Sequence, residues 1–232
     1  NIIFMSKYAN LPTNPTEEEI KSEIARLKSL ANEYKNEEQS IKLVINSIYG
    51  GLGNQYFVAH NSDVAESVTL QGQDLLKYSD SVVNNYFLNE WHEDHETHRA
   101  MGIDGPVSRV KNPVSVYGDT DSLYISFEEA ISSCNWDKDP KDFILELNRT
   151  KLKSYLDAKF EEYANRWNTK NYQDFELENI SEAGIWLAKK KYLLNVTWES
   201  GIDIESLTHL VYKGVELAQS STPPFAREKL AE

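Results

Sequence analysis

Two carboxylates separated by a single residue form the segment of this chain best suited to hold a metal ion. Asp119 and Asp121 follow Tyr117 and Gly118 and precede Ser122. Side chains two positions apart share a face of a strand, so both carboxylates point the same way if strand geometry persists through the turn. Mg²⁺ is typically held by one or two carboxylates together with substrate phosphates. Aspartate also favours turns, and the bare pattern more often marks an ordinary turn, so both interpretations stay open here.

A second group of side chains recurs at helical spacing upstream. At 100° per residue, Lys42, Asn46 and Tyr49 fall within about 60° of one another on a helix. The apolar stripe expected to face the core lies about 120° away and comprises Ile41, Ile45 and Ile48. A lysine, an amide and an aromatic ring on one exposed stripe can bind a phosphate, orient a polar edge and stack on a base. An ordinary solvated helix face has the same spacing and is the favoured interpretation on this pattern alone.

Three consecutive lysines form the one concentrated basic site in a chain with a formal net charge of −13. Because the overall field repels nucleic acid, any such binding must come from a local patch. Alternation over residues 186–198 predicts one strand, with Lys190 and Tyr192 on one face and Lys189 on the other. Lysines beside an aromatic ring suit a nucleic-acid backbone. An edge strand protected from aggregation by lysines is the alternative.

Helical periodicity predicts the elements that position these groups. Thr16 and Glu19 form a capping box that opens one amphipathic helix, and a second helix begins near Ser40 and ends at the glycines of residues 50–53. Two consecutive helices with a short joint predict a helical hairpin. The remaining predicted elements are a helix over 62–87, an irregular insertion over about 88–112, a β-hairpin over 114–127, a helical segment over 140–167, and strands near 175 and over 186–198. This mixture predicts the α+β class.

Two features within these elements carry their own expectations. Gly72 interrupts the helix over 62–87, and a close approach of another backbone would explain it. In the insertion, His92, His95 and His98 recur every three residues. This spacing invites a metal-binding interpretation, but it does not match H-E-x-x-H. A polar surface excursion is therefore the favoured interpretation.

Length and composition predict a folded chain of one or two domains. Leu, Ile, Val and Phe make up a quarter of its 232 residues, above the roughly 20% below which disorder is expected. The lone Cys134 excludes an intrachain disulfide and is expected to be a buried thiol in a reducing compartment. The longest uncharged run, residues 43–62, is too polar to cross a membrane. We expect a cytoplasmic location, no membrane partner, and a piece of a longer product.

Together, these segments resemble family B DNA polymerases, most closely the T-even bacteriophage type. Residues 42–50 match the fingers motif K-x-x-x-N-S-x-Y-G, and residues 117–122 match the palm motif Y-G-D-T-D-S. Residues 189–192 are similar to a K-K-x-Y strand. Further matches in the family's order are T-x-x-G at residues 69–72 and G-x-E…S-S-T-P at Gly214, Glu216 and residues 220–223.

The resemblance implies an architecture and a reaction. Residues 1–58 would form a helical-hairpin fingers subdomain, residues 59–213 the palm, an antiparallel sheet backed by helices, and residues 214–232 the start of the thumb. A primer 3′-oxygen would attack the α-phosphate of a deoxynucleoside triphosphate (dNTP), helped by two Mg²⁺ ions about 4 Å apart, with Mn²⁺ as a substitute. The implied partners are primer–template DNA and a dNTP.

The resemblance also implies roles for single residues near the nucleotide. Lys42 would contact the triphosphate and assist catalysis. Asn46, Tyr49 and Gly50 would line the nascent base pair. The acidic tip near residue 120 would face this stripe across one cleft.

Further roles concern the metals and the DNA. By similarity, Asp121 would be the principal metal ligand, Asp119 a less direct participant in catalysis, and Glu178 an acidic residue close to the metals. Residues 189–190 and Tyr192 would hold the primer–template duplex.

One departure from the family matters for activity. The upstream palm motif D-x-x-S-L-Y-P, which supplies another metal-binding aspartate, is not among the 232 residues, nor are the exonuclease domain and most of the thumb. We therefore expect the chain alone to fold without catalysing synthesis, and to need a second polypeptide carrying the missing palm and exonuclease segments if the polymerase is split. The alternatives are a non-catalytic nucleic-acid-binding remnant and a small carboxylate–metal phosphohydrolase.

Overall fold

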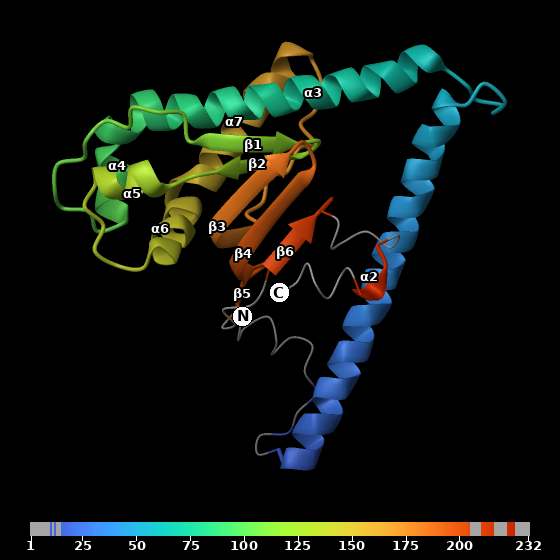
Figure 1. The fold of residues 1–232 in the computed structure, drawn as a ribbon, viewed down its shortest axis with the longest axis horizontal. Helices are drawn as coiled ribbons and strands as arrows, with labels where there is room; N and C mark the ends of the chain where they lie inside the picture. The colour runs from blue at the N-terminus through green and yellow to red at the C-terminus, as the bar shows by residue number, and fades with distance from the viewer. Residues whose placement is uncertain (1–9, 11, 13–14, 205–209, 216–221, 226–232) are drawn as a thin grey trace. The chain divides into compact units, whose positions relative to one another are not determined.

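The fold is described from a computed structural model (Figure 1). It describes residues 10, 12, 15–204, 210–215 and 222–225. The chain divides into two compact units, residues 1–71 and 72–232, and each is described by itself. The division into fingers, palm and thumb stays a prediction. Within the described ranges, no helix has the length and apolar character needed to cross a membrane.

Unit 1 is built on α2 (Glu17–Gly53), a single helix of 37 residues. Its capping box is present: the Glu19 amide donates to Thr16 Oγ1 (3.3 Å), and the Thr16 amide donates to Glu19 Oε2 (2.7 Å). The predicted second helix start near Ser40 is wrong, and these residues form no hairpin. No glycine or proline interrupts the helix before Gly50, and the Ser40 hydroxyl donates to the Asn36 carbonyl instead of capping a new helix.

The predicted helix over 62–87 is confirmed as α3 (Ser62–Asn85), which passes into a π-helical turn, η1 (Tyr86–Glu90). Of this helix, residues 72–85 belong to unit 2. The expectation that a backbone approaches Gly72 closely is wrong, because no described atom lies within 4 Å of where its Cβ would be.

Part of the segment predicted as a polar surface excursion is instead buried in the core of unit 2. The segment forms η2 (Trp91–Glu93) and α4 (His95–Ala100), and Trp91 and His98 are buried. Asp94 supports this segment: it caps α4 through the Thr97 amide (3.1 Å), accepts from the Tyr86 hydroxyl (3.0 Å) and pairs with Lys151 (3.0 Å). The buried Nε2 of His98 has no hydrogen-bond partner among the described residues. The surface prediction is thus wrong for Trp91 and His98, whereas Glu93, His95 and Glu96 are exposed.

The predicted hairpin is confirmed as β1 (Ser115–Asp119) and β2 (Ser122–Ile125), which pair in an antiparallel register. The predicted helical segment is confirmed as α6 (Pro140–Leu147), the π-helical turn η3 (Asn148–Leu152) and α7 (Lys153–Arg166). A short helix that the periodicity did not predict, α5 (Glu128–Ser133), lies between them. Aromatic and aliphatic side chains from these helices and from the insertion form the main core, whose fully buried members include Tyr86, Phe87, Trp91, Phe143 and Leu147.

The second sheet contains β3 (Asn179–Ala188), β4 (Lys191–Glu199), β5 (Ile202–Asp203) and β6 (Leu210–Lys213), with β5 and β6 both antiparallel to β4. The single strand predicted over 186–198 is wrong, because residues 189–190 form a tight turn between β3 and β4. Lys190 has a positive φ of 61°, which reverses the chain and ends the alternation. Helices and antiparallel sheets are interspersed, which confirms the α+β class.

Candidate functional site

The tip of the β1–β2 hairpin places the two aspartates in different environments. The Asp119 side chain is 6% exposed, whereas Asp121 is exposed. Thr120 between them has a φ of 59°, and the Asp121 amide donates to the Asp119 carbonyl (2.7 Å). The tight turn therefore directs one carboxylate inward and leaves the other facing solvent.

The Lys189–Lys190 turn contacts this acidic tip. Lys190 Nζ lies 3.0 Å from Asp119 Oδ1 and 3.4 Å from the Thr120 hydroxyl. The Lys190 amide also donates to the Tyr117 hydroxyl (2.7 Å). Two tight turns, far apart in the sequence, are thus joined through both a side chain and a backbone group.

The ion pair keeps Asp119 charged in a buried position. Burial by itself would raise the pKa of Asp119, but hydrogen bonds from Lys190 and Thr120 outweigh it and hold that pKa below its usual value. Lys213, which the sequence analysis did not single out, also lowers this pKa through its charge. The second oxygen of the carboxylate, Oδ2, is buried and has no hydrogen-bond partner within the described structure.

An aromatic cluster supports the two turns. Tyr192 on β4 is buried against the rings of Tyr117 and Tyr124, and its hydroxyl accepts from the Tyr124 hydroxyl (2.7 Å). Burial, together with this hydrogen bond, raises the pKa of Tyr124 to about 12. Trp186 faces Tyr192 across the strand pair and packs on the same cluster. Tyr192 thus packs, as a buried residue, against the β1–β2 hairpin that carries the acidic tip.

Glu178 is not brought to this tip. It is exposed and precedes β3, and its carbonyl accepts from the Ser200 amide at the end of the sheet opposite the Lys189–Lys190 turn. At roughly 3.3 Å per residue, the ten residues of β3 separate Glu178 from the turn by about 30 Å. The exposed Lys189 lies in the turn itself.

The predicted nucleotide-binding residues lie on α2 in unit 1. Lys42, Asn46 and Tyr49 are all exposed, and Lys42 Nζ forms an ion pair with Glu38 Oε1 one turn away (2.6 Å). No described atom lies within 4 Å of where a Gly50 Cβ would be. The stripe expected to face the core is exposed as well, at 56–61% for Ile41, Ile45 and Ile48. These residues and the acidic tip belong to separate units, so their convergence on one nucleotide stays a prediction.

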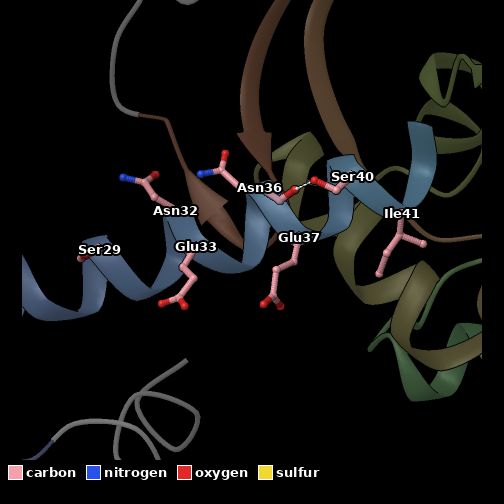
Figure 2. Close-up of a pocket in the computed structure, with 7 residues that line it drawn as sticks. All are labelled: Ser29, Asn32, Glu33, Asn36, Glu37, Ser40 and Ile41. Atoms are coloured by element: carbon pink, nitrogen blue, oxygen red, sulfur yellow. Dashed lines mark hydrogen bonds between the residues drawn. The ribbon is translucent and has the colours of Figure 1, made fainter. Parts of the chain in front are cut away.

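A hollow of about 740 Å³ lies beside α2, and Figure 2 draws seven residues that line it. The described lining residues all come from this one helix, and the Ser40 hydroxyl donates to the Asn36 carbonyl among them (2.8 Å). None of the predicted nucleotide-binding residues lines the hollow, so it is not the candidate site. Its lining residues are Ser29, Asn32, Glu33, Asn36, Glu37, Ser40 and Ile41.

The described residues contain no cluster of three or more histidine, cysteine, aspartate or glutamate side chains that could hold a metal ion by themselves. Mg²⁺ needs fewer protein ligands than that, since it usually keeps several waters and binds substrate phosphates. The exposed Asp121 and the unpartnered Oδ2 of Asp119 fit such a site. Glu216, Ser220 and Ser221 lie outside the described residues.

The chain is similar to known polymerases over most of its length. Residues 16–135 match the family model described as DNA polymerase family B. The DNA-directed DNA polymerase of Escherichia phage RB69 is 31% identical over 82% of this chain and 21% of its own length. That of Enterobacteria phage T4 is 27% identical over 99% of this chain and 25% of its own length. The DNA polymerase of Choristoneura biennis entomopoxvirus is 30% identical over 71% of this chain and 17% of its own length. The chain thus spans about a quarter or less of the length of these relatives.

Proposed function

The chain belongs to DNA polymerase family B, and from this membership we propose that it is part of a DNA-directed DNA polymerase, which transfers nucleotides from dNTPs to a primer 3′-OH on a template. The acidic tip of the β1–β2 hairpin carries the proposal, because it lies within the region that matches the family and is held in place by a lysine.

We assign metal binding to the acidic tip. Asp121 is the main ligand, since its carboxylate is exposed, and Asp119 contributes its unpartnered Oδ2. Mg²⁺, or Mn²⁺ in its place, would supply stabilisation of the charge that develops on the α-phosphate during attack by the 3′-oxygen, with two ions in the complete site. Glu178 has no part in this assignment, because β3 holds it at the far end of the sheet.

Lys190 provides positive charge beside these carboxylates. An ammonium group has three donor hydrogens, so Lys190 can keep its contact with Asp119 and still donate to a phosphate of the DNA or the nucleotide. The Lys190 side chain is 59% exposed, so a phosphate can approach its ammonium group from solvent. Lys189 provides a second exposed cation in the same turn. Tyr192 supports the site indirectly, through its buried packing against Tyr117.

We assign nucleotide binding to the exposed stripe of α2. Lys42 can exchange its ion pair with Glu38, which is 61% exposed, for a triphosphate at little cost, because exposed ion pairs contribute little to stability. The Tyr49 ring and the Asn46 amide are available to the base, and Gly50 leaves the adjacent surface clear.

We propose that the 232 residues alone do not catalyse synthesis, because the motif D-x-x-S-L-Y-P is not among them. A second polypeptide bearing this motif would restore activity in a split polymerase. The matching test is primer extension with Mg²⁺, first by the chain alone and then after mixing with such a polypeptide. Template-directed synthesis by the chain alone would refute the proposed inactivity.

Thermal unfolding with a dNTP and Mg²⁺ tests the nucleotide site directly. A ligand at about 100 times its Kd stabilises the folded state by about 2.7 kcal/mol. We expect this stabilisation to disappear in Lys42→Met and Asp121→Asn. It should persist in the matched controls Lys35→Met and Asp137→Asn, which change exposed residues of the same charge elsewhere. Duplex DNA binding without dNTP binding would favour a non-catalytic remnant, and hydrolysis of a simple phosphoester would favour a phosphohydrolase.

A further inference from the structure

The turn that carries Lys190 is held in a conformation that lysine does not favour. Lys190 has a φ of 61°, in the left-handed region that non-glycine residues rarely occupy. Thr120 in the opposing turn has a φ of 59°. Such conformations persist only where the surrounding structure enforces them. The contacts of Lys190 with Asp119 and Tyr117 account for part of that enforcement.

Gly214, which directly follows β6, lies against the same turn. Because Lys213 pairs with Tyr192, the chain at Gly214 runs beside the start of β4, where the turn ends. A Cβ at Gly214 would lie 1.9 Å from the Lys190 carbonyl oxygen, far inside the roughly 3.5 Å of ordinary van der Waals contact. Gly214 itself has a φ of 66°, which also favours glycine.

We propose that Gly214 is a positioning residue: its bare backbone lets the Lys190 carbonyl dock against the end of β6, and this fixes the Lys190 ammonium on Asp119. A side chain at position 214 must move either β6 or the turn by more than 1 Å, because the overlap is with backbone rather than with a flexible side chain. In the turn, such a shift changes where the lysine charge lies relative to the acidic tip. The relevance of Gly214 to catalysis rests on the proposed polymerase function.

The test measures the carbon-13 chemical shift of the Asp119 carboxylate at one neutral pH in the 232-residue chain, in the absence of DNA and nucleotide. Lys190→Met defines the change in chemical shift that follows complete loss of the ammonium. We expect Gly214→Ala to produce at least half of that change. Gly105→Ala is the matched control, because that glycine belongs to the same unit and a Cβ there meets no described atom within 4 Å. It should leave the chemical shift of the Asp119 carboxylate unchanged.

An unchanged chemical shift of the Asp119 carboxylate in folded Gly214→Ala would overturn the proposal. If that variant does not fold, Lys190→Gly combined with Gly214→Ala decides, because glycine at position 190 lets the turn yield to the added methyl group. Recovery of cooperative unfolding in the double variant supports docking of the turn on Gly214, and no recovery overturns it. Since the chemical shift is measured without substrate, a failure of dNTP binding would count against the polymerase assignment and leave this inference standing.

Discussion

Replacing Asp94 with alanine should destabilise the chain more than any change to an exposed carboxylate. Asp94 caps α4 through the Thr97 amide, accepts from the buried Tyr86 hydroxyl and pairs with Lys151. Burial, and next the charge of Asp94, raise the pKa of Tyr86, as expected for a phenol that must remain a donor. Alanine removes all three interactions at once.

The expected cost follows from these contacts. Loss of the cap costs about 1 kcal/mol, and a buried hydroxyl left without an acceptor costs about 1–3 kcal/mol. The Lys151 side chain is 30% exposed, so loss of its ion pair adds at most about 1 kcal/mol. The three contributions share one side chain and are not strictly additive. We therefore expect Asp94→Ala to lower the free energy of unfolding by about 3 kcal/mol and the Tm by about 6–12 °C.

Urea unfolding followed by tryptophan fluorescence measures this change, since the buried Trp91 lies in the same cluster. Glu93→Ala is the matched control: the adjacent carboxylate is 76% exposed, and its ion pair is with His92 (3.3 Å). Its free energy of unfolding should stay within about 0.5 kcal/mol of the unsubstituted chain. A loss below 1 kcal/mol in Asp94→Ala, or one equal to that of Glu93→Ala, would refute the assignment of Asp94 as the organiser of this segment.

Three further predictions concern charge and capping. Lys190→Met should raise the pKa of Asp119, because a buried carboxylate then loses the cation 3.0 Å away; carbon-13 NMR would show an unchanged value if the contact were incidental. Burial lowers the pKa of His98, so the unfolded state binds more protons, and stability should be complete above about pH 6.5 and fall as the pH drops through that value. Urea titrations at pH 7 and 5 should show a smaller difference for His98→Gln, and an equal one would contradict this account. Thr16→Ala should cost about 1 kcal/mol in local opening of α2, seen as faster hydrogen exchange of the Glu19 amide; unaltered exchange would show that the capping box contributes little.

Local sequence signals predicted the elements that depend on near neighbours. The capping box at Thr16 and the helix from Ser62 follow from hydrogen bonds and side-chain spacing within a few residues, and the structure has both. The predicted joint near Ser40 is absent, because the sequence there contains no glycine or proline that would break the helix. The prediction of a single strand over 186–198 is wrong because Lys190 reverses the chain with a positive φ. Glycine would have signalled such a turn in the sequence, whereas lysine does not.

The sequence by itself determined which chemistry the chain can offer, through the residue order around Asp119 and Asp121 and the exposed stripe of Lys42, Asn46 and Tyr49 on α2. It also determined the family to which the chain belongs. Only the tertiary structure decided which groups work together. It paired Lys190 with Asp119, placed Glu178 at the other end of a strand and buried His98 in the core. The turn that carries Lys190 and the turn that carries Asp119 and Thr120 lie about 70 positions apart in the sequence. No sequence pattern of period 2 or 3.6 encodes a contact over such a separation.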